Sequence, residues 1–251
     1  MSGYSKIASF YTHLFPLSDE AKGFLEPFVS RCRERSRSWL DVGCGTGNLL
    51  VWLLDRGVNA FGIEPDPDFA DEARKRIPGQ ADRVIEAHMG ELGKMESGTR
   101  YGVISCLGNV LPHVASLEEV QSFFGDAGAI LADDGAAIVQ IVNYDKVLAT
   151  TDWQFPVLRR VAPDGTELVF HRAYEIAPNQ RGGLIKFETV LRAGEETFRN
   201  CVWLCPIRKD SLLDAARPCF ESLEVFGDFK GNHWSPESAA TILVAEKPVR
   251  S

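Results

Sequence analysis

Three glycines stand where the chain could hold a ligand against its own backbone. Gly43, Gly45 and Gly47 in "LDVGCGTGNLL" directly follow an apolar run typical of a strand. Glycine has no side chain, so the backbone can turn tightly and a ligand can approach the main chain. The segment after Gly47 has helical periodicity, and the first turn of a helix presents free N–H groups and a positive dipole end. The pattern predicts a small-molecule site at a strand-to-helix turn.

An acidic residue further along indicates the type of ligand. Glu64 in "GIEPD" ends the next predicted strand, where a carboxylate can accept hydrogen bonds from both hydroxyls of a ribose. A glycine turn followed by such an acid is typical of an adenosyl site. Asn48 replaces the third glycine of a dinucleotide fingerprint, so a nicotinamide-dependent oxidoreductase is the weaker interpretation. In the alternative without function, the glycines only form a turn and Glu64 is a solvated strand end.

A sheet is needed to position these residues, and the first 145 residues alternate between strand and helix signals. The predicted strands are 38–42, 59–64, 83–87, 101–107 and 135–142, and helices are expected at 48–57, 67–77 and 116–131. Short connections between such elements indicate β-α-β units. We expect an α/β fold with a Rossmann-like, mostly parallel sheet and helices on both faces. The glycine turn then lies at the edge where such sheets bind ligands.

The helical period disappears between Trp153 and Leu204. Strand-like segments follow one another at 168–176, 184–192 and 197–204, separated by turn-rich stretches. This pattern predicts an inserted antiparallel β meander. A helix at 209–220 and strands at 222–229 and 240–247 would complete a seven-stranded sheet. The expected layout is a ligand-binding domain at 1–150 and 205–251, with 151–204 as an inserted subdomain that covers the site.

Composition limits the class of protein and its partners. The chain has 251 residues, 45% of them hydrophobic, which is enough for a full core. A formal net charge of -8 repels phosphate backbones, so we expect no nucleic-acid partner. The basic cluster "RCRERSR" at 31–37 is most simply a solvated helix face. No apolar stretch approaches the roughly 20 residues that cross a bilayer, and the first residues lack signal-peptide features. We therefore expect a cytoplasmic protein with no membrane partner.

The cysteines do not form a ligand pattern. Six of them are scattered along the chain, with no C-x-x-C pair and no metal-ligand grouping with the five histidines. Cys44 and Cys106 lie in or beside apolar runs, where cysteine acts as a small buried hydrophobe. We expect reduced thiols and no metal.

The motifs resemble those of a known family. "LDVGCGTGNLL" and "GIEPD" are similar to the cofactor-binding segments of class I S-adenosylmethionine-dependent methyltransferases, and the predicted seven-strand order agrees over nearly the whole chain. "SCLGNVLPHV" (105–114), "NYD" (143–145) and the late antiparallel insertion resemble the glycine N-methyltransferase-like group. The resemblance implies a transferase that methylates a small molecule, with S-adenosylmethionine as cofactor and S-adenosylhomocysteine as product.

The resemblance also implies roles for individual residues. The implied cofactor-binding residues are Tyr11, Asp41, Gly43, Gly45, Gly47, Glu64, Pro65, Met89 and Leu107. The implied acceptor-binding residues are Tyr11, Asn109, His113, Asn143 and Tyr144, and the catalytic candidates among them are Asn109, His113 and Tyr144. Tyr11 fits equally well as an aromatic side chain that packs on the sheet edge. In the alternative for His113, the imidazole caps the next helix or stabilises the loop beside Pro112.

Methyl transfer makes few chemical demands on the protein. A sulfonium methyl is already activated, so the enzyme must hold a lone pair in line with the S–CH3 bond and exclude water. We expect SN2 transfer to an amine nitrogen, which must be neutral when it attacks. His113 could hydrogen-bond the acceptor or take its proton. An O-methyltransferase and a non-catalytic adenosyl-binding protein are the alternatives.

One departure from the family pattern limits the choice of acceptor. Glycine-methylating relatives place an arginine immediately before "NYD", where it can bind the substrate carboxylate, but this chain has Val142 there. Glycine itself is therefore not the expected acceptor. Arg159, Arg160 and Arg172 in the meander are candidates to replace the charge, and an apolar or neutral acceptor is the equal alternative. Because a meander can also pair at its edges, a homodimer is a further expectation.

Overall fold

Two β-sheets organise the chain in the computed structural model, which describes residues 4–95, 100–150, 152–176 and 183–250. The larger sheet has seven strands in the order β11-β12-β5-β4-β1-β2-β3. Its strands are β1 (Ser38–Val42), β2 (Asn59–Ile63), β3 (Val84–Ile85), β4 (Tyr101–Cys106), β5 (Leu131–Val142), β11 (Phe220–Phe226) and β12 (Ala240–Pro248). The pairs among β1 to β5 are parallel, and β12 pairs antiparallel with both β5 and β11.

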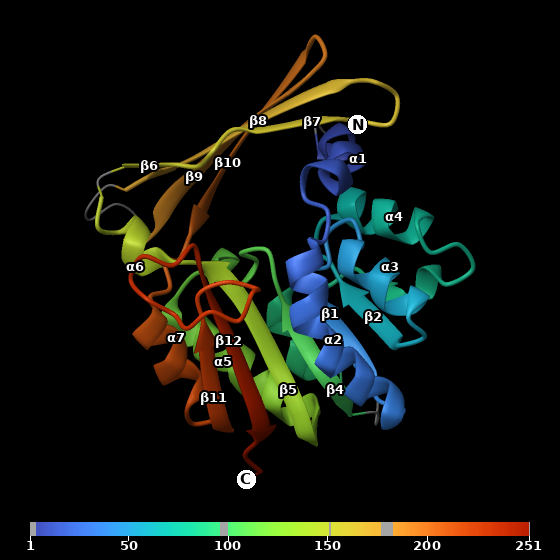
Figure 1. The fold of residues 1–251 in the computed structure, drawn as a ribbon, viewed down its shortest axis with the longest axis vertical. Coiled ribbons are helices and arrows are strands. Elements are labelled where there is room, and N and C mark those ends of the chain that lie inside the picture. Colours follow the sequence, from blue (N-terminus) through green and yellow to red (C-terminus); the bar gives the residue numbers. More distant parts are fainter. Residues whose placement is uncertain (1–3, 96–99, 151, 177–182, 251) are drawn as a thin grey trace.

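Helices cover both faces of the seven-stranded sheet (Figure 1). The helices are α1 (Tyr4–Leu14), α2 (Asp19–Glu34), α3 (Asn48–Asp55), α4 (Pro67–Lys75), α5 (Leu117–Ile130), α6 (Tyr144–Val147) and α7 (Lys209–Ala216), with the 3-10 turns η1 (Ala81–Arg83), η2 (Met89–Lys94) and η3 (Leu111–His113). Neighbouring strand residues point to opposite faces. Ile138 therefore packs with α2, α3 and α4, while Val139 packs with α5 and α7. The expected α/β class is confirmed.

Two strand boundaries differ from the sequence prediction. β5 begins at Leu131, earlier than the expected 135, because a bulge opposite Gly102 lets it accommodate the polar residues Asp133 and Asp134. β3 has only two residues, Val84 and Ile85, because the chain then leaves the sheet edge toward η2. The other expected strands and helices occur within a few residues of their predicted positions.

The second sheet is antiparallel and lies over the carboxyl ends of the parallel strands (Figure 1). Its strands are β6 (Asp152–Gln154), β7 (Leu158–Val161), β8 (Glu167–Glu175), β9 (Ile185–Ala193) and β10 (Glu196–Leu204). Antiparallel strands therefore occur where the meander was expected, and most of the turn expected at 177–183 lies outside the described residues. Leu168 and Phe170 of β8 pack with Leu14, so α1 fits beneath this sheet. Within the described ranges no helix is long and apolar enough to cross a membrane.

Candidate cofactor and acceptor site

The glycine turn joins β1 to α3 and contains three left-handed backbone positions. Gly43, Gly45 and Gly47 have φ angles of 70°, 56° and 78°. A Cβ on Gly43 would collide with the side chain of Val110, and one on Gly47 would lie 3.1 Å from Cβ of Ala73. A Cβ on Gly45 would have no protein atom within 4 Å. Gly43 and Gly47 are therefore required for packing, whereas Gly45 borders open space that a ligand can fill.

Glu64 is bound directly to this turn. Its Oε2 accepts a hydrogen bond from the Gly45 amide at 2.9 Å, and its Oε1 accepts one from the Asp66 amide at 3.0 Å. Each carboxylate oxygen keeps a further lone pair for a ligand. Burial raises the pKa of Glu64, and the two backbone hydrogen bonds oppose that shift. Gly45 and Glu64 thus form a single polar unit at the carboxyl ends of β1 and β2.

Asp41 lies on the same edge, inside the sheet. Its Oδ1 accepts a hydrogen bond of 2.7 Å from the Ser105 hydroxyl, which in turn accepts one of 2.8 Å from the Trp39 indole. Burial raises the pKa of Asp41 to about 7, although the bond from Ser105 opposes the shift. The buried carboxyl is therefore poised to change its charge near neutral pH.

A polar network fastens α1 to the glycine turn. The Thr12 hydroxyl donates to that of Thr46 at 2.7 Å, and the Asn48 amide donates to the Phe15 carbonyl at 2.8 Å. Arg76 donates to the Thr46 carbonyl at 2.6 Å and to Oδ1 of Asn48 at 2.8 Å. Asn48, which departs from the dinucleotide fingerprint, therefore positions α1 against the turn.

Tyr11 lies on α1 among aromatic rings. Its ring centroid is 4.8 Å from that of Phe15 and 5.0 Å from that of Phe69. Burial raises the pKa of Tyr11, the nearby charge of Glu64 raises it further, and Arg172 lowers it. The aromatic packing agrees with a structural role for Tyr11, and the electrostatic effect of Glu64 agrees with a position near the cofactor. Its contact with a ligand stays a prediction.

Asn109 connects the two sheets. It follows β4 in a left-handed conformation with φ of 67°, and its Oδ1 accepts from the Val142 amide at 2.9 Å. Its Nδ2 donates to the hydroxyls of Tyr144 at 3.1 Å and Tyr174 at 3.2 Å, and these hydroxyls lie 3.3 Å apart. Burial raises the pKa of both phenols, that of Tyr174 to about 12, so both stay protonated at neutral pH.

Tyr174 was not among the residues expected from the sequence. It lies in the strand predicted at 168–176, and the sequence carried no signal for what its hydroxyl would meet. Its position on the buried face of β8 brings it to Asn109 and Tyr144 from the other sheet. We name these three residues the Asn109 cluster.

Two of the expected acceptor-binding residues, Asn143 and His113, show no side-chain hydrogen bond to the Asn109 cluster within the described part of the chain. The Nδ2 of Asn143 donates to the carbonyls of Ser235, Pro236 and Ser238 at 3.0 to 3.3 Å, which anchors that loop at the end of β5. This contact favours a structural role for Asn143. His113 ends η3 with its side chain open to solvent, although neighbouring atoms desolvate it enough to lower its pKa. No described side chain hydrogen-bonds its imidazole.

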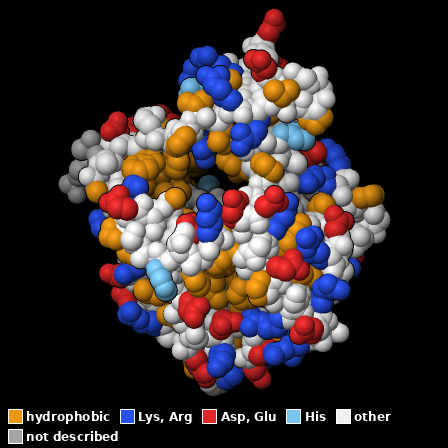
Figure 2. Space-filling model, in the orientation of Figure 1, with side chains coloured by type: hydrophobic (Ala, Val, Ile, Leu, Met, Phe, Trp, Pro, Cys, Tyr) orange, Lys and Arg blue, Asp and Glu red, His pale blue; other side chains and the backbone are white. Residues whose placement is uncertain are grey.

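The remaining expected cofactor-binding residues lie in segments that follow the strands. Pro65 is exposed directly after Glu64, Met89 begins η2 half-buried, and Leu107 is half-buried after β4. Figure 2 shows a hollow between the second sheet and the seven-stranded sheet, with hydrophobic side chains gathered beside it. Among the described residues, no group of His, Cys, Asp and Glu side chains could hold a metal ion.

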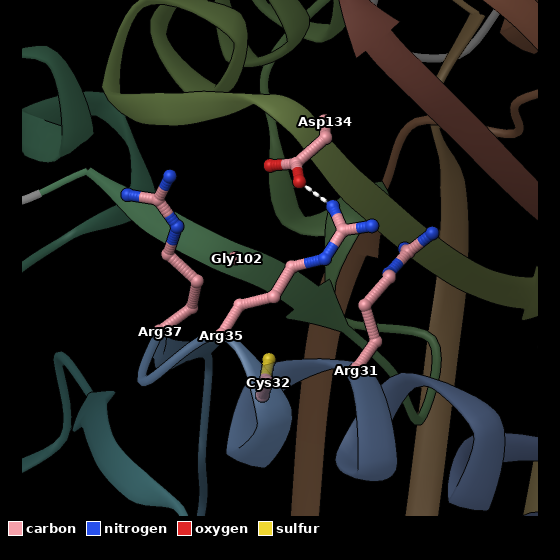
Figure 3. Close-up of a pocket in the computed structure, with 6 residues that line it drawn as sticks. All are labelled: Arg31, Cys32, Arg35, Arg37, Gly102 and Asp134. Carbon is pink, nitrogen blue, oxygen red and sulfur yellow. Dashed lines mark ion pairs between the residues drawn. The ribbon is translucent and has the colours of Figure 1, made fainter.

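A second pocket lies at the opposite edge of the sheet (Figure 3). It is formed by the end of α2 and by the amino ends of β4 and β5, far along the strands from the glycine turn. Arg35 pairs with Asp134 there, and Arg31 pairs with Glu246 of β12 at 2.6 Å. Two arginines of the cluster expected to form a solvated face therefore join α2 to the sheet.

The fold and the site together define a Rossmann-like protein with an adenosyl-type site. Residues 17–168 match the family model described as "Methyltransferase domain", so the chain belongs to that family. This membership confirms the expected class of S-adenosylmethionine-dependent methyltransferases.

Individual relatives agree with this assignment. The chain is 26% identical over 89% of its length to a glycine/sarcosine/dimethylglycine N-methyltransferase from Actinopolyspora halophila. It is 30% identical over 46% of its length to a dTDP-3-amino-3,6-dideoxy-alpha-D-glucopyranose N,N-dimethyltransferase from Streptomyces fradiae. The matches span 38% and 44% of the lengths of these two relatives. The fold matches that of a solved S-adenosylmethionine-dependent methyltransferase from Clostridium acetobutylicum, with a TM-score of 0.72, 15% identity and coverage of 97% of this chain and 98% of the other.

Proposed function

We propose that this chain transfers a methyl group from S-adenosylmethionine to an amine nitrogen of a small molecule. The observation that carries the proposal is the unit of Gly45 and Glu64, in which a backbone amide and a buried carboxylate border open space. Family membership supports methyl transfer as the reaction. The two curated relatives, which are both named as N-methyltransferases, support nitrogen as the acceptor atom.

The residues at the carboxyl edge fit the proposed cofactor. A free face beside Gly45 admits the ligand to the backbone, and the spare lone pairs of Glu64 suit the two hydroxyls of a ribose. Asp41 lies beside the turn and would offset the positive charge of the methionine part, while Tyr11 and Met89 would cover the adenosyl part. When bound, the cofactor supplies a methyl group on a positively charged sulfur.

The Asn109 cluster would position the acceptor. The amide hydrogens of Asn109 are both used on the two phenols, and one phenol hydrogen can be used between the hydroxyls. One hydroxyl hydrogen and one lone pair remain, so the two hydroxyls can orient a polar group of the acceptor. Apolar surroundings also depress the pKa of an amine, which keeps its attacking lone pair free. A neutral His113 could take up the released proton.

The second sheet would cover the acceptor. In the proposed layout, residues 1–150 and 205–251 bind the cofactor and residues 151–204 exclude water from the reacting groups. The homodimer, the lack of a nucleic-acid partner and the cytoplasmic location stay predictions from the sequence.

The test is a transfer assay with purified protein and labelled S-adenosylmethionine. A panel of small amines and matched hydroxyl compounds is assayed for S-adenosylhomocysteine release, with the Gly45→Val variant as a control that lacks the cofactor site. We expect turnover on amines by the wild-type protein alone. Turnover on hydroxyl compounds alone would assign O-methylation. S-adenosylhomocysteine binding without transfer to any compound would indicate a non-catalytic binding protein.

A further inference from the structure

Arg172 occupies the inward face of β8, between two residues that contact segments outside the second sheet. Residues two apart on a strand share a face, so Phe170, Arg172 and Tyr174 point the same way. Phe170 is 6% exposed and packs edge-on against Phe15 of the segment after α1, and Tyr174 is 1% exposed and bonds to Asn109. Arg172 is half-buried between these two contacts.

Aromatic rings surround the guanidinium without providing acceptors for its hydrogens. Its central carbon lies 4.9 Å from the ring centroid of Phe155, 5.3 Å from that of Phe15 and 5.8 Å from that of Phe170. Arg172 forms no ion pair with a carboxylate of the described residues, and its buried Nε has no hydrogen-bond partner there. Its Nη2 lies 3.5 Å from the Pro156 carbonyl, at the long limit of a hydrogen bond. The N–H donors of the Arg172 guanidinium are thus nearly unused within the described residues.

Electrostatic contacts place Arg172 between the two halves of the candidate site. Its positive charge lowers the pKa of Tyr11 and of Tyr174, so it lies within range of both phenols. The charge of Glu64 has the opposite effect and raises the pKa of Tyr11, so Tyr11 lies within range of both groups, and Tyr174 belongs to the Asn109 cluster. The other two arginines proposed from the sequence, Arg159 and Arg160, are exposed on β7.

We propose that Arg172 determines acceptor specificity by binding an anionic group, a carboxylate or a phosphate, carried by the acceptor near its amine. This inference rests on the proposed methyl transfer and names the chemical class of the acceptor. A desolvated cation with unused N–H groups is costly for the protein unless a ligand supplies the missing partner. The planar guanidinium suits the paired oxygens of a carboxylate or phosphate, and the rings hold its plane in place.

The test compares pairs of amines in which one member carries an anionic group and the other does not. Three pairs are used: sarcosine with sarcosinamide, alanine with alaninamide, and O-phosphoethanolamine with ethanolamine. Binding to the protein loaded with S-adenosylhomocysteine is measured by calorimetry, and methyl transfer is measured separately. The variants are Arg172→Met, which keeps much of the packing on the rings, and Arg172→Lys, which keeps the charge without the fork. The matched control is Arg159→Met on the neighbouring strand.

For at least one pair, we expect the wild-type protein to prefer the anionic member. Arg172→Met should weaken binding of that member by about 10- to 100-fold, the range for a lost charge-assisted hydrogen bond, with a smaller effect in Arg172→Lys. KM should change more than kcat, and S-adenosylhomocysteine affinity should stay unchanged. The pair that shows this preference identifies the bound group as a carboxylate or a phosphate. Arg159→Met should behave as the wild type.

Two results would overturn the assignment of Arg172. In one, no anionic member binds the loaded wild-type protein, and in the other, Arg172→Met binds charged and neutral members with unchanged preference. The assignment can stand without the proposed function. If an anionic amine binds through Arg172 and receives no methyl group, then the anion site is correct and amine methylation is wrong for that acceptor.

Discussion

At the scale of single residues, the three glycines of the turn have different roles, two in folding and one in ligand binding. Gly43 and Gly47 are needed because a side chain there would meet Val110 or Ala73, whereas the open side of Gly45 faces no protein atom. The sequence pattern treats the three glycines alike, because spacing shows where a backbone turns and not what surrounds it. Only Gly45 therefore gives a direct test of where the ligand lies.

Gly45→Val should abolish S-adenosylmethionine binding. The branched side chain would occupy the space beside the turn and would strain a backbone with φ of 56°. Gly57→Val is the matched control, because Gly57 also has a positive φ of 74° with open space around it, at the other end of α3. Calorimetry should show binding by the Gly57 variant alone. Full affinity in a folded Gly45 variant would place the ligand elsewhere.

Glu64→Ala should weaken S-adenosylmethionine binding by about 1 to 3 kcal/mol, as expected for lost hydrogen bonds to a charged group. The loss has two parts, because the carboxylate would contact the ribose and also holds the Gly45 amide in place. Glu64→Gln keeps one acceptor oxygen and should lose less. Glu86→Ala, on an exposed carboxylate paired with Arg74, is the control. Unchanged affinity in Glu64→Ala would remove this residue from the cofactor site.

Asp41→Asn should change how stability depends on pH. Burial raises the pKa of Asp41 to about 7, above the unfolded value of about 4, so the folded state holds the proton more tightly. The stabilisation that comes from this tighter proton binding is therefore complete below about pH 4, and it is lost as the pH rises through 7. Asparagine cannot ionise and still accepts from Ser105. The melting temperature of the variant should rise relative to the wild type between pH 4 and 7, and parallel curves would contradict this.

The roles that the sequence could not assign depend on contacts between distant segments. Tyr174 was missed, and Arg172 was one of three candidate arginines, because a strand-like segment does not show which partners its side chains meet across the molecule. Asn143 fits a family motif, yet its amide is used by the carbonyls of residues 235–238, far along the chain. Glu64 was easier to place, because its position at a strand end is set locally.

At the scale of elements, the loop after β4 and strand β8 depend on each other. Asn109 holds a left-handed backbone conformation, and its side chain is fixed by one amide of β5 and by two phenols. One of those phenols comes from α6 and the other from the second sheet. A change in the position of β8 is therefore transmitted to the loop that borders the proposed acceptor.

Tyr174→Phe should lower methyl transfer and leave cofactor affinity unchanged. The variant keeps the ring packing on Phe155 and Phe187 but removes an acceptor for Asn109. Looser positioning of the acceptor should reduce kcat by about tenfold. Thr197→Val, which removes an exposed hydroxyl from the same sheet, is the control. Unchanged kcat on the true acceptor would make the Asn109 cluster purely structural.

Element types were largely predictable because they depend on local periodicity. The order of strands and helices follows from apolar runs that repeat at two or at three to four residues. The short strands β6 and β7 and the helices α1, α2 and α6 were not predicted as elements. The apolar side chains of α1 pack on two separate partners, since Leu14 contacts the second sheet and Tyr11 contacts the ring of Phe69.

At the scale of the whole molecule, the two sheets enclose the site from opposite sides. The seven-stranded sheet provides the glycine turn and Glu64 at its carboxyl edge, while β8 provides Arg172 and Tyr174 from above (Figure 1). Figure 2 shows hydrophobic side chains gathered beside a hollow between the sheets. We name the mutually packed rings of Phe155, Tyr174 and Phe187 the aromatic wall. This arrangement separates cofactor binding from acceptor binding, so the two should respond to different substitutions.

Phe155→Ala tests this separation. The ring packs on Trp153, Tyr174 and Phe187, and it also covers the guanidinium of Arg172. Removing a half-buried ring should lower the free energy of unfolding by about 1 to 3 kcal/mol, less than for a fully buried one. It should also raise the acceptor KM, because the aromatic wall loosens and water enters.

The cofactor half should stay intact in Phe155→Ala. Ligand that binds only the folded state raises the melting temperature by mass action, so S-adenosylhomocysteine should shift the variant and the wild type equally. Val161→Ala is the control, because this side chain of β7 lies on the same sheet and is 66% exposed. It should change neither the acceptor KM nor the thermal shift caused by S-adenosylhomocysteine. If Phe155→Ala loses the thermal shift together with acceptor binding, then the second sheet also forms part of the cofactor site. Cofactor binding and acceptor binding would then depend on the same residues.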